Sequence, residues 1–141
     1  MSKKQKEIIL SVCLTCTLNK AQNNNKLAGE KLAQKLIDKF KNTKNVTLRG
    51  VNCMSNCKRS CIVSFTAENC FTYVFGDIDP ENSAYIDSIE ELLLSYGKSD
   101  DGFLRRRHRP EIYRSNIVGR FPPINSKSCL LYTSPSPRDR T

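Results

Sequence analysis

Apolar residues recur along the chain with two different periods, one typical of strands and the other of helices. Ile8 to Val12 is a short β-branched run, which predicts a strand. Apolar and polar residues alternate again from Val46 to Gly50, which predicts a second strand. Between them, from about Lys26 to Lys41, apolar residues recur at helical spacing. They predict an amphipathic helix whose buried face holds Leu32, Ala33, Leu36, Ile37 and Phe40.

Two more strands and a second helix are expected further along the chain. The runs at 61–66 and 71–75 flank a short turn, and strands joined in this way form an antiparallel hairpin. Asp79 is predicted to be the N-cap of the second helix, with Pro80 at its first position and Gly97 at its C-terminal stop. Its buried stripe is expected to comprise Ile86, Ile89, Leu92, Leu93 and Tyr96.

The predicted element order is β-α-β-β-β-α. A βαβ unit followed by a hairpin and a helix is the thioredoxin-like arrangement, an α/β fold with a mixed sheet. From Arg105 to Pro123 the sequence has no clear periodicity and contains several prolines. We therefore expect a domain over residues 1–104, followed at 105–128 by an irregular C-terminal arm that is packed on the domain or mobile.

Residues 129–141 differ in amino-acid composition from the rest of the chain. The segment "CLLYTSPSPRD" interrupts a Lys- and Asn-rich sequence and resembles one reading frame of a sequencing-library adapter. We therefore expect these residues to be an artefactual tail of a metagenomic read, and we exclude them from the fold. Cys129 is not offered as a ligand for the same reason.

Length and composition narrow the class of protein. The 141 residues suit one domain, and no apolar run is long enough to span a bilayer, so no membrane partner is expected. The basic segment before Ile8 lacks the cleavage pattern of a signal peptide, which favours a cytoplasmic protein. In a reducing compartment, clustered cysteines favour metal or redox chemistry over disulfides.

The net charge of +9 is spread over scattered lysines, with one exception. The run from Arg105 to Arg109 could bind phosphate or an acidic partner. The alternative, which we favour, is pairing with nearby acids: Asp77, Asp79 and Glu81. Aromatic residues are not interleaved with the arginines, so nucleic acid is not an expected partner. His108, within the run, is expected at the surface.

Five cysteines lie after the first two predicted strands. Cys13 and Cys16 form a C-x2-C pair after the first strand, and Cys53, Cys57 and Cys61 follow the second at four-residue steps. Thiolates are soft ligands that suit zinc, Cu(I) or iron–sulfur clusters, and a [2Fe–2S] cluster needs four of them. Parallel strands end at one edge of a sheet. The pairs Cys13/Cys16 and Cys53/Cys57 are therefore the candidate cluster ligands, with Cys61 a further candidate metal ligand.

Other functions fit the same cysteines. Zinc is the alternative cofactor, in a structural or metal-delivery module. A dithiol oxidoreductase using Cys13 and Cys16 is a further alternative. Hydrolytic motifs are absent from the sequence, which favours a non-enzymatic redox or metal-binding protein. Lys58 and Arg59 would either lower the pKa of neighbouring thiols or be ordinary loop charges, and Cys70 is expected to be a small buried residue.

Four segments carry a resemblance to a known family. The motifs "NCMSNCKRSC", "YVFGDIDPE", "SDDGFLRRRHRPE" and "GRFPP" resemble a bacterial family of unknown function described as predicted metal-binding proteins. The resemblance covers roughly Ile8 to Pro123. That family is similar to the thioredoxin-like [2Fe–2S] ferredoxins, whose second ligand pair is C-x3-C, and Cys53 and Cys57 match that pair.

The resemblance implies a [2Fe–2S] carrier that acts in electron transfer or metal handling. Its partner would be a redox or metal-handling protein, and a homodimer is also compatible with the sequence. In the ferredoxins the first ligand pair is spaced more widely than Cys13 and Cys16, and Cys61 has no cysteine counterpart.

Overall fold

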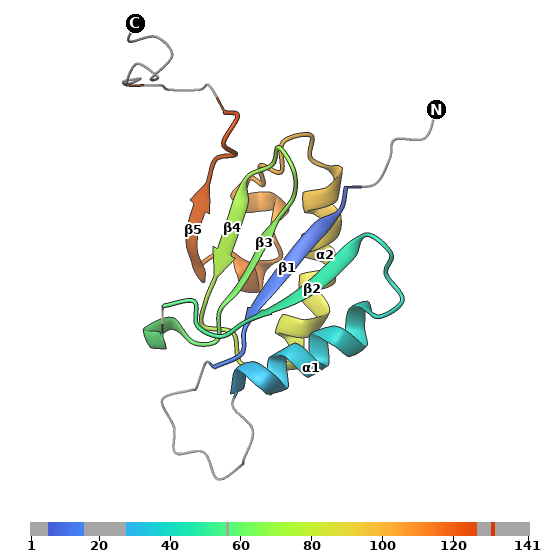
Figure 1. Cartoon of the computed structure of the whole chain (residues 1–141), viewed down its shortest axis with the longest axis vertical. Helices are drawn as coiled ribbons and strands as arrows, with labels where there is room; N and C mark the ends of the chain where they lie inside the picture. The colour runs from blue at the N-terminus through green and yellow to red at the C-terminus, as the bar shows by residue number, and fades with distance from the viewer. Residues whose placement is uncertain (1–5, 16–27, 56, 127–130, 132–141) are drawn as a thin grey trace, which may run out of the picture.

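The computed structural model describes residues 6–15, 28–55, 57–126 and 131. In this part of the chain, two long helices pack against a mixed sheet with strand order β2-β1-β3-β4-β5 (Figure 1). The elements are β1 (Ile8–Cys13), α1 (Ala28–Phe40), β2 (Val46–Val51), η1 (Cys57–Arg59), β3 (Val63–Thr66), β4 (Thr72–Phe75), α2 (Ser83–Lys98), η2 (Arg106–His108), η3 (Glu111–Tyr113) and β5 (Ile117–Phe121).

The strand directions confirm the predicted α/β, thioredoxin-like arrangement. β1 and β2 run parallel, from Ile8 opposite Val46 to Cys13 opposite Val51, with α1 as the crossover between them. β3 is antiparallel to β1, and β4 is antiparallel to β3. The parallel pair brings the carboxyl ends of β1 and β2, after which the candidate cysteine ligands follow, to the same edge of the sheet.

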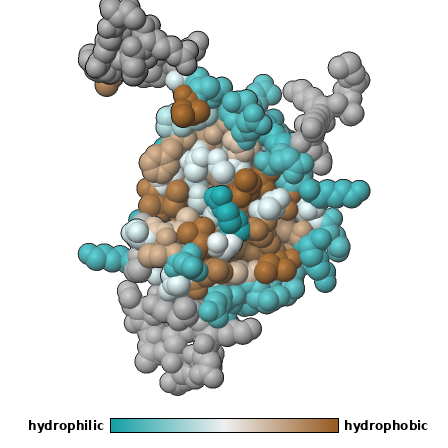
Figure 2. Space-filling model, in the orientation of Figure 1, coloured by the Kyte–Doolittle hydropathy of each residue, from teal (hydrophilic) through white to brown (hydrophobic). Residues whose placement is uncertain are grey.

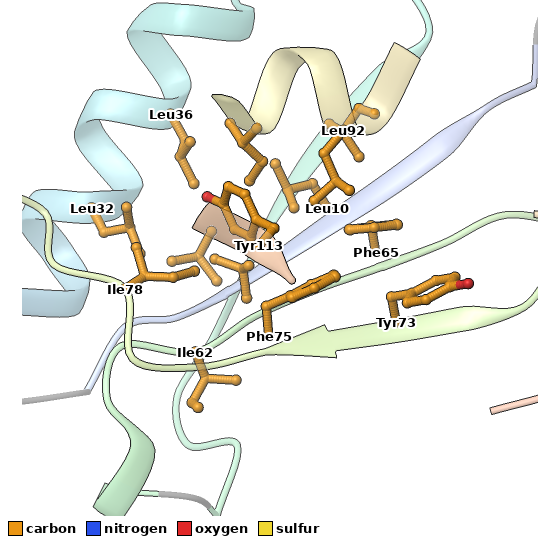
Figure 3. Close-up of a cluster of buried hydrophobic side chains, with 14 of the residues drawn as sticks. Leu10, Leu32, Leu36, Ile62, Phe65, Tyr73, Phe75, Ile78, Leu92 and Tyr113 are labelled. Carbon is orange, nitrogen blue, oxygen red and sulfur yellow. The ribbon is translucent and has the colours of Figure 1, made fainter. Parts of the chain in front are cut away.

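One hydrophobic core joins the helices to the sheet. Figure 3 shows Leu36 of α1 and Leu92 of α2 directed toward Leu10 and Phe65 of the sheet, and all four side chains are fully buried. Phe65 also contacts the ring of Tyr96 edge-on, at a centroid distance of 4.7 Å. Burying large apolar side chains of this kind is the main source of stability, at roughly 1.5–3 kcal/mol each.

The other face of the sheet carries polar residues that bond to one another. Arg49 Nε donates to Ser11 Oγ at 2.9 Å, and the hydroxyls of Thr66 and Thr72 lie 2.8 Å apart. Figure 2 shows hydrophilic and hydrophobic residues side by side on the face viewed in Figure 1. The alternation along β1, with Leu10 and Val12 in the core and Ser11 between them, follows from the period of two in a strand.

Several details of the predicted helices are wrong. Ile37 does not belong to the buried face of α1, since 45% of its surface is exposed. The N-cap of α2 is Asn82, whose side chain accepts a hydrogen bond from the amide of Ala84. Asp79 instead accepts from the amide of Glu81 at 2.9 Å and so forms a turn before the helix begins. Gly97 lies within α2, which ends one residue later.

The C-terminal arm is packed on the domain and forms a strand, β5, that the sequence pattern did not indicate. β5 is antiparallel to β4, with a register shift at Val74 and Phe75. Tyr113 is fully buried and its hydroxyl donates to the carbonyl of Tyr85 at 2.8 Å. Cys129 and the rest of the expected tail lie outside the described residues, except Leu131, which is almost fully exposed. No helix in the described segments is long and apolar enough to cross a membrane.

Candidate metal centre

The segments that follow β1 and β2 are bonded to each other. Cys13 is the last residue of β1 and lies opposite Val51, the last residue of β2. Beyond this pair, the amide of Leu14 donates to the carbonyl of Val51 at 2.8 Å, and the hydroxyl of Thr15 donates to the carbonyl of Asn52. The chain leading to Cys53 is therefore held beside Cys13, as the parallel arrangement predicts.

The start of α1 approaches Cys13 closely. A Cβ atom added to Gly29 would lie 2.0 Å from the carbonyl oxygen of Cys13, well inside van der Waals contact. Only glycine allows the helix backbone to come so near the end of β1. The helical spacing of the apolar residues predicts this helix but gives no role to Gly29. A glycine near the start of a predicted helix is the signal that could have indicated close packing there.

Cys53 is exposed and its sulfur accepts a backbone hydrogen bond. The amide of Ser55 donates to Cys53 Sγ at 3.4 Å, and Ser55 adopts a left-handed conformation with a φ of 59°. Hydrogen bonds to the sulfur atoms are among the features that set the potential of an iron–sulfur cluster. The loop after β2 thus presents a thiol that suits a soft metal.

Cys61 lies at the same edge of the sheet, just before β3. The amide of Cys13 donates to the carbonyl of Ile62 at 3.1 Å, which places Cys61 beside the end of β1. Cys61 itself is fully buried, and its backbone exchanges two hydrogen bonds with Ile78, at 3.1 and 3.2 Å. It belongs to the hydrophobic core, whereas its role as a metal ligand stays a prediction.

The complete ligand set extends beyond the described side chains. Cys16 lies outside the described residues, and only the backbone of Cys57 is described, at the start of η1. Within the described segments, no group of three or more His, Cys, Asp or Glu side chains is placed to hold a metal ion. The four-cysteine set therefore stays a prediction that rests on the geometry of the two strand ends.

Arg59 has a partner other than the cysteines. Its guanidinium pairs with Asp77, with distances of 2.6 Å from Nη2 and 2.8 Å from Nε to Oδ2. The hydrogen bond and the charge of Asp77 raise the pKa of Arg59. The amide of Asp77 also donates to the carbonyl of Arg59 at 2.6 Å. Arg59 thus joins η1 to the segment before α2, while Lys58 is exposed.

Two other residues lie where the sequence predicts. Cys70 is buried in the β3–β4 connection. Because Ile9 of β1 pairs with Thr66 near that turn, Cys70 lies at the end of the sheet opposite Cys13. His108 is exposed in η2, at the surface as expected.

The expected pairing of the arginine run with Asp77, Asp79 and Glu81 is not found in the described part of the chain. Asp77 pairs with Arg59, and Glu81 lies 3.8 and 3.9 Å from the ammonium groups of Lys31 and Lys35. The run packs instead near Ser88 and Glu91, in the middle of α2.

Comparison of the sequence with known protein families finds a match. Residues 10–123 match the family described as Protein of unknown function (DUF1636). The chain belongs to this family. The DUF1636 match covers nearly all of the fold, from β1 to the residues just after β5. None of the curated proteins matches the chain.

Two solved structures are similar to this DUF1636 protein. One is a thioredoxin-like [2Fe-2S] ferredoxin from Aquifex aeolicus, at 11% identity and a TM-score of 0.49, with 84% of this chain and 96% of the ferredoxin covered. The other is the wild-type thioredoxin-like [2Fe-2S] ferredoxin from the same organism, at 11% identity and a TM-score of 0.47, with 79% and 96% covered.

Proposed function

We propose that this protein binds a [2Fe–2S] cluster through Cys13, Cys16, Cys53 and Cys57 and acts in electron transfer or metal handling. The observation that carries the proposal is the coupling of the two strand ends, in which Cys13 lies opposite Val51 and the following residues are bonded across the strands. One thiol pair follows each strand end, and a [2Fe–2S] cluster takes two thiolates at each iron.

The environment of the described thiols supports this proposal. Cys53 is exposed and its Sγ accepts a hydrogen bond from the amide of Ser55, a contact of the kind that cluster sulfurs make. Cys13 is buried at the sheet edge, where low solvent exposure would protect a cluster from hydrolysis and oxidation. The protein would work in the cytoplasm, with a redox or metal-handling protein as its partner.

The direct test is metal and acid-labile sulfide analysis of protein purified without oxygen. The expected result is iron and sulfide in equal amounts, two of each per chain, with visible absorption typical of a [2Fe–2S] cluster. Replacing Cys13 or Cys53 by Ser should remove the colour. Cys70→Ala is the matched control, because it removes a thiol at the opposite end of the sheet and should leave the colour unchanged.

Other outcomes would identify another function. Stoichiometric zinc in a colourless protein would show that the same thiols form a zinc site. A metal-free protein with a reducible Cys13–Cys16 disulfide would show a dithiol oxidoreductase. If Cys61→Ser bleaches the protein while Cys16→Ser does not, the fourth ligand is Cys61.

A further inference from the structure

A buried arginine in the C-terminal arm, Arg109, forms no ion pair with a carboxylate of the described residues. Arg109 is only 6% exposed, and its Nε atom makes no hydrogen bond. In the described segments its guanidinium forms no ion pair with a carboxylate. A buried charge without a counter-charge is costly, so proteins almost always provide a partner for it.

The charges around Arg109 increase this cost. Burial, together with the guanidinium groups of Arg106, Arg114 and Arg120, lowers the pKa of Arg109, while Tyr73 acts in the opposite direction. Four arginines thus share one region, and mutual repulsion among them opposes folding. An ion of opposite charge bound among the arginines would offset this repulsion.

Backbone carbonyls, not carboxylates, hold the cluster in place. Arg114 Nε donates to the carbonyl of Arg109 at 3.1 Å, and Arg106 Nη1 donates to the carbonyl of Arg114 at 3.3 Å. The amide of Arg109 donates to the carbonyl of Arg106 at 3.2 Å, which closes η2. A carbonyl fixes the position of a guanidinium without neutralising its charge. The guanidinium groups of Arg106 and Arg114 are therefore held in place beside Arg109 with their charges uncompensated by these bonds.

A surface depression opens beside these residues. It has a volume of about 620 Å³, lies between α2 and the arm, and is lined by Arg107, His108, Arg109 and Arg114. This volume is in the range of small-molecule sites. Glu91 and Glu111 also line it and would repel a long polyanion. No phenylalanine, tyrosine or tryptophan lines it, so stacked bases have no platform there.

We propose that this depression is an oxyanion site that binds the phosphate or pyrophosphate group of a small molecule, with Arg107 and Arg109 as its main ligands. Guanidinium groups bind phosphate oxygens in pairs and with favourable geometry, which makes arginine the usual residue for this purpose. The site is distinct from the cysteine edge and does not depend on a bound cluster.

Calorimetric titration with inorganic phosphate and with pyrophosphate tests the proposal, with sodium chloride holding the ionic strength constant. The full-length chain should bind at least one of the two anions. Arg107→Gln removes an exposed ligand and should weaken binding about tenfold or more. Arg109→Gln should abolish measurable binding. Arg105→Gln is the matched control, because it removes the same charge from the same run at a residue outside the depression, and it should bind like the parent protein.

Thermal unfolding gives a second and independent signature. Without anion, Arg109→Gln should be at least as stable as the parent protein, because it removes an uncompensated buried charge. With phosphate, the parent protein and Arg105→Gln should gain stability, while Arg109→Gln should not.

Three results would overturn the proposal. One is the absence of binding of both anions by the parent protein. Another is equal affinity in the parent protein, Arg107→Gln and Arg109→Gln. The third is an oligonucleotide that binds more tightly than pyrophosphate at the same ionic strength and loses its affinity in Arg107→Gln, which would assign the surface to nucleic acid. If Arg109→Gln does not fold, Arg107→Gln against Arg105→Gln still decides the question.

Discussion

At the scale of single residues, two glycines have opposite roles in the two helices. Gly29 lies where α1 touches the end of β1, and its missing side chain is what allows the contact with Cys13. Gly97 lies in the last turn of α2, where an added Cβ would have its nearest neighbour 3.8 Å away, at Ile8 Cδ1. The same substitution should therefore have opposite effects at these positions.

We predict that Gly29→Ala destabilises the protein and Gly97→Ala stabilises it. The added methyl group at 29 must displace the backbone of Cys13, at a cost of about 1–3 kcal/mol or more. At position 97 the added methyl group fits without a clash. Alanine within a helix stabilises a protein by roughly 0.5–1 kcal/mol relative to glycine. Denaturant unfolding of the two variants measures both changes. Equal stability of Gly29→Ala and the parent protein would show that α1 does not press on the end of β1.

Buried tyrosines should make the fold sensitive to high pH. Burial, and then the influence of Cys70, raises the pKa of Tyr96, while burial and Tyr85 raise the pKa of Tyr113. In the unfolded chain tyrosine titrates near pH 10, so this stabilisation is complete below about pH 10 and is lost as the pH rises toward the folded pKa.

We therefore predict that the free energy of unfolding falls with rising pH above about pH 10, more steeply than in the variant with both Tyr96→Phe and Tyr113→Phe. At neutral pH that variant should be less stable by roughly 1 kcal/mol per lost hydrogen bond. Absorbance of tyrosinate should appear together with unfolding. Identical slopes in the two proteins would show that Tyr96 and Tyr113 do not cause the alkaline sensitivity.

Single residues also show what the sequence could and could not predict. The spacing of Cys13 and Cys53 relative to two predicted strands placed them at one edge, because parallel strands share their carboxyl end. The hydrogen bond from Ser55 to Cys53 could not be predicted, since it depends on a left-handed backbone at a residue that is neither Gly nor Asn. The partner of Asp77 was missed because Arg59 is distant in sequence and reaches it only in the folded loop.

At the scale of elements, the periodic segments were predictable and their ends were not. The stripes of α1 and α2 identified both helices because burial follows the helical period. The start of α2 was misplaced because Asp79 and Pro80 form a starting signal that the chain uses for a turn. β5 was not predicted because a strand at the edge of a sheet needs little alternation of apolar and polar residues. Gly119 interrupts the short alternation that β5 has.

The assignment of the N-cap gives a prediction for α2. Asn82→Ala should destabilise the protein by about 1 kcal/mol, because the amide of Ala84 loses its acceptor. Asn82→Gly should cost only a few tenths of a kcal/mol, since glycine also suits the cap position. Chemical denaturation of the pair gives the comparison. A larger loss in Asn82→Gly than in Asn82→Ala would mean that the residue acts through something other than capping.

At the scale of the whole molecule, the C-terminal arm completes the sheet and connects it to α2. Asn116 is 5% exposed, its side chain donates to the carbonyl of Gly76 at 3.1 Å, and its own carbonyl accepts from the amide of Gly76 at 2.9 Å. Tyr113 packs edge-on against Phe75 of β4, with a centroid distance of 5.3 Å. These contacts begin before β5 and join it to the core, so the arm is part of the folded unit.

Two truncations separate this arm from the residues that follow it. Ending the chain after Ser128 removes 129–141 and should leave both the unfolding midpoint and the metal content unchanged, as the adapter-like sequence of that segment predicts. Ending it after Ser115 also removes Asn116 and β5. It leaves the amide and carbonyl of Gly76 without their partners and exposes the edge of β4.

Each lost buried hydrogen bond costs about 1–3 kcal/mol, and the midpoint of a domain of this size falls by roughly 2–8 °C for each kcal/mol. Thermal unfolding followed by circular dichroism, with iron content measured on the same samples, distinguishes the two. A midpoint that falls in the Ser128 truncation would show that the last residues belong to the fold, and one that is unchanged in the Ser115 truncation would show that β5 contributes nothing to it.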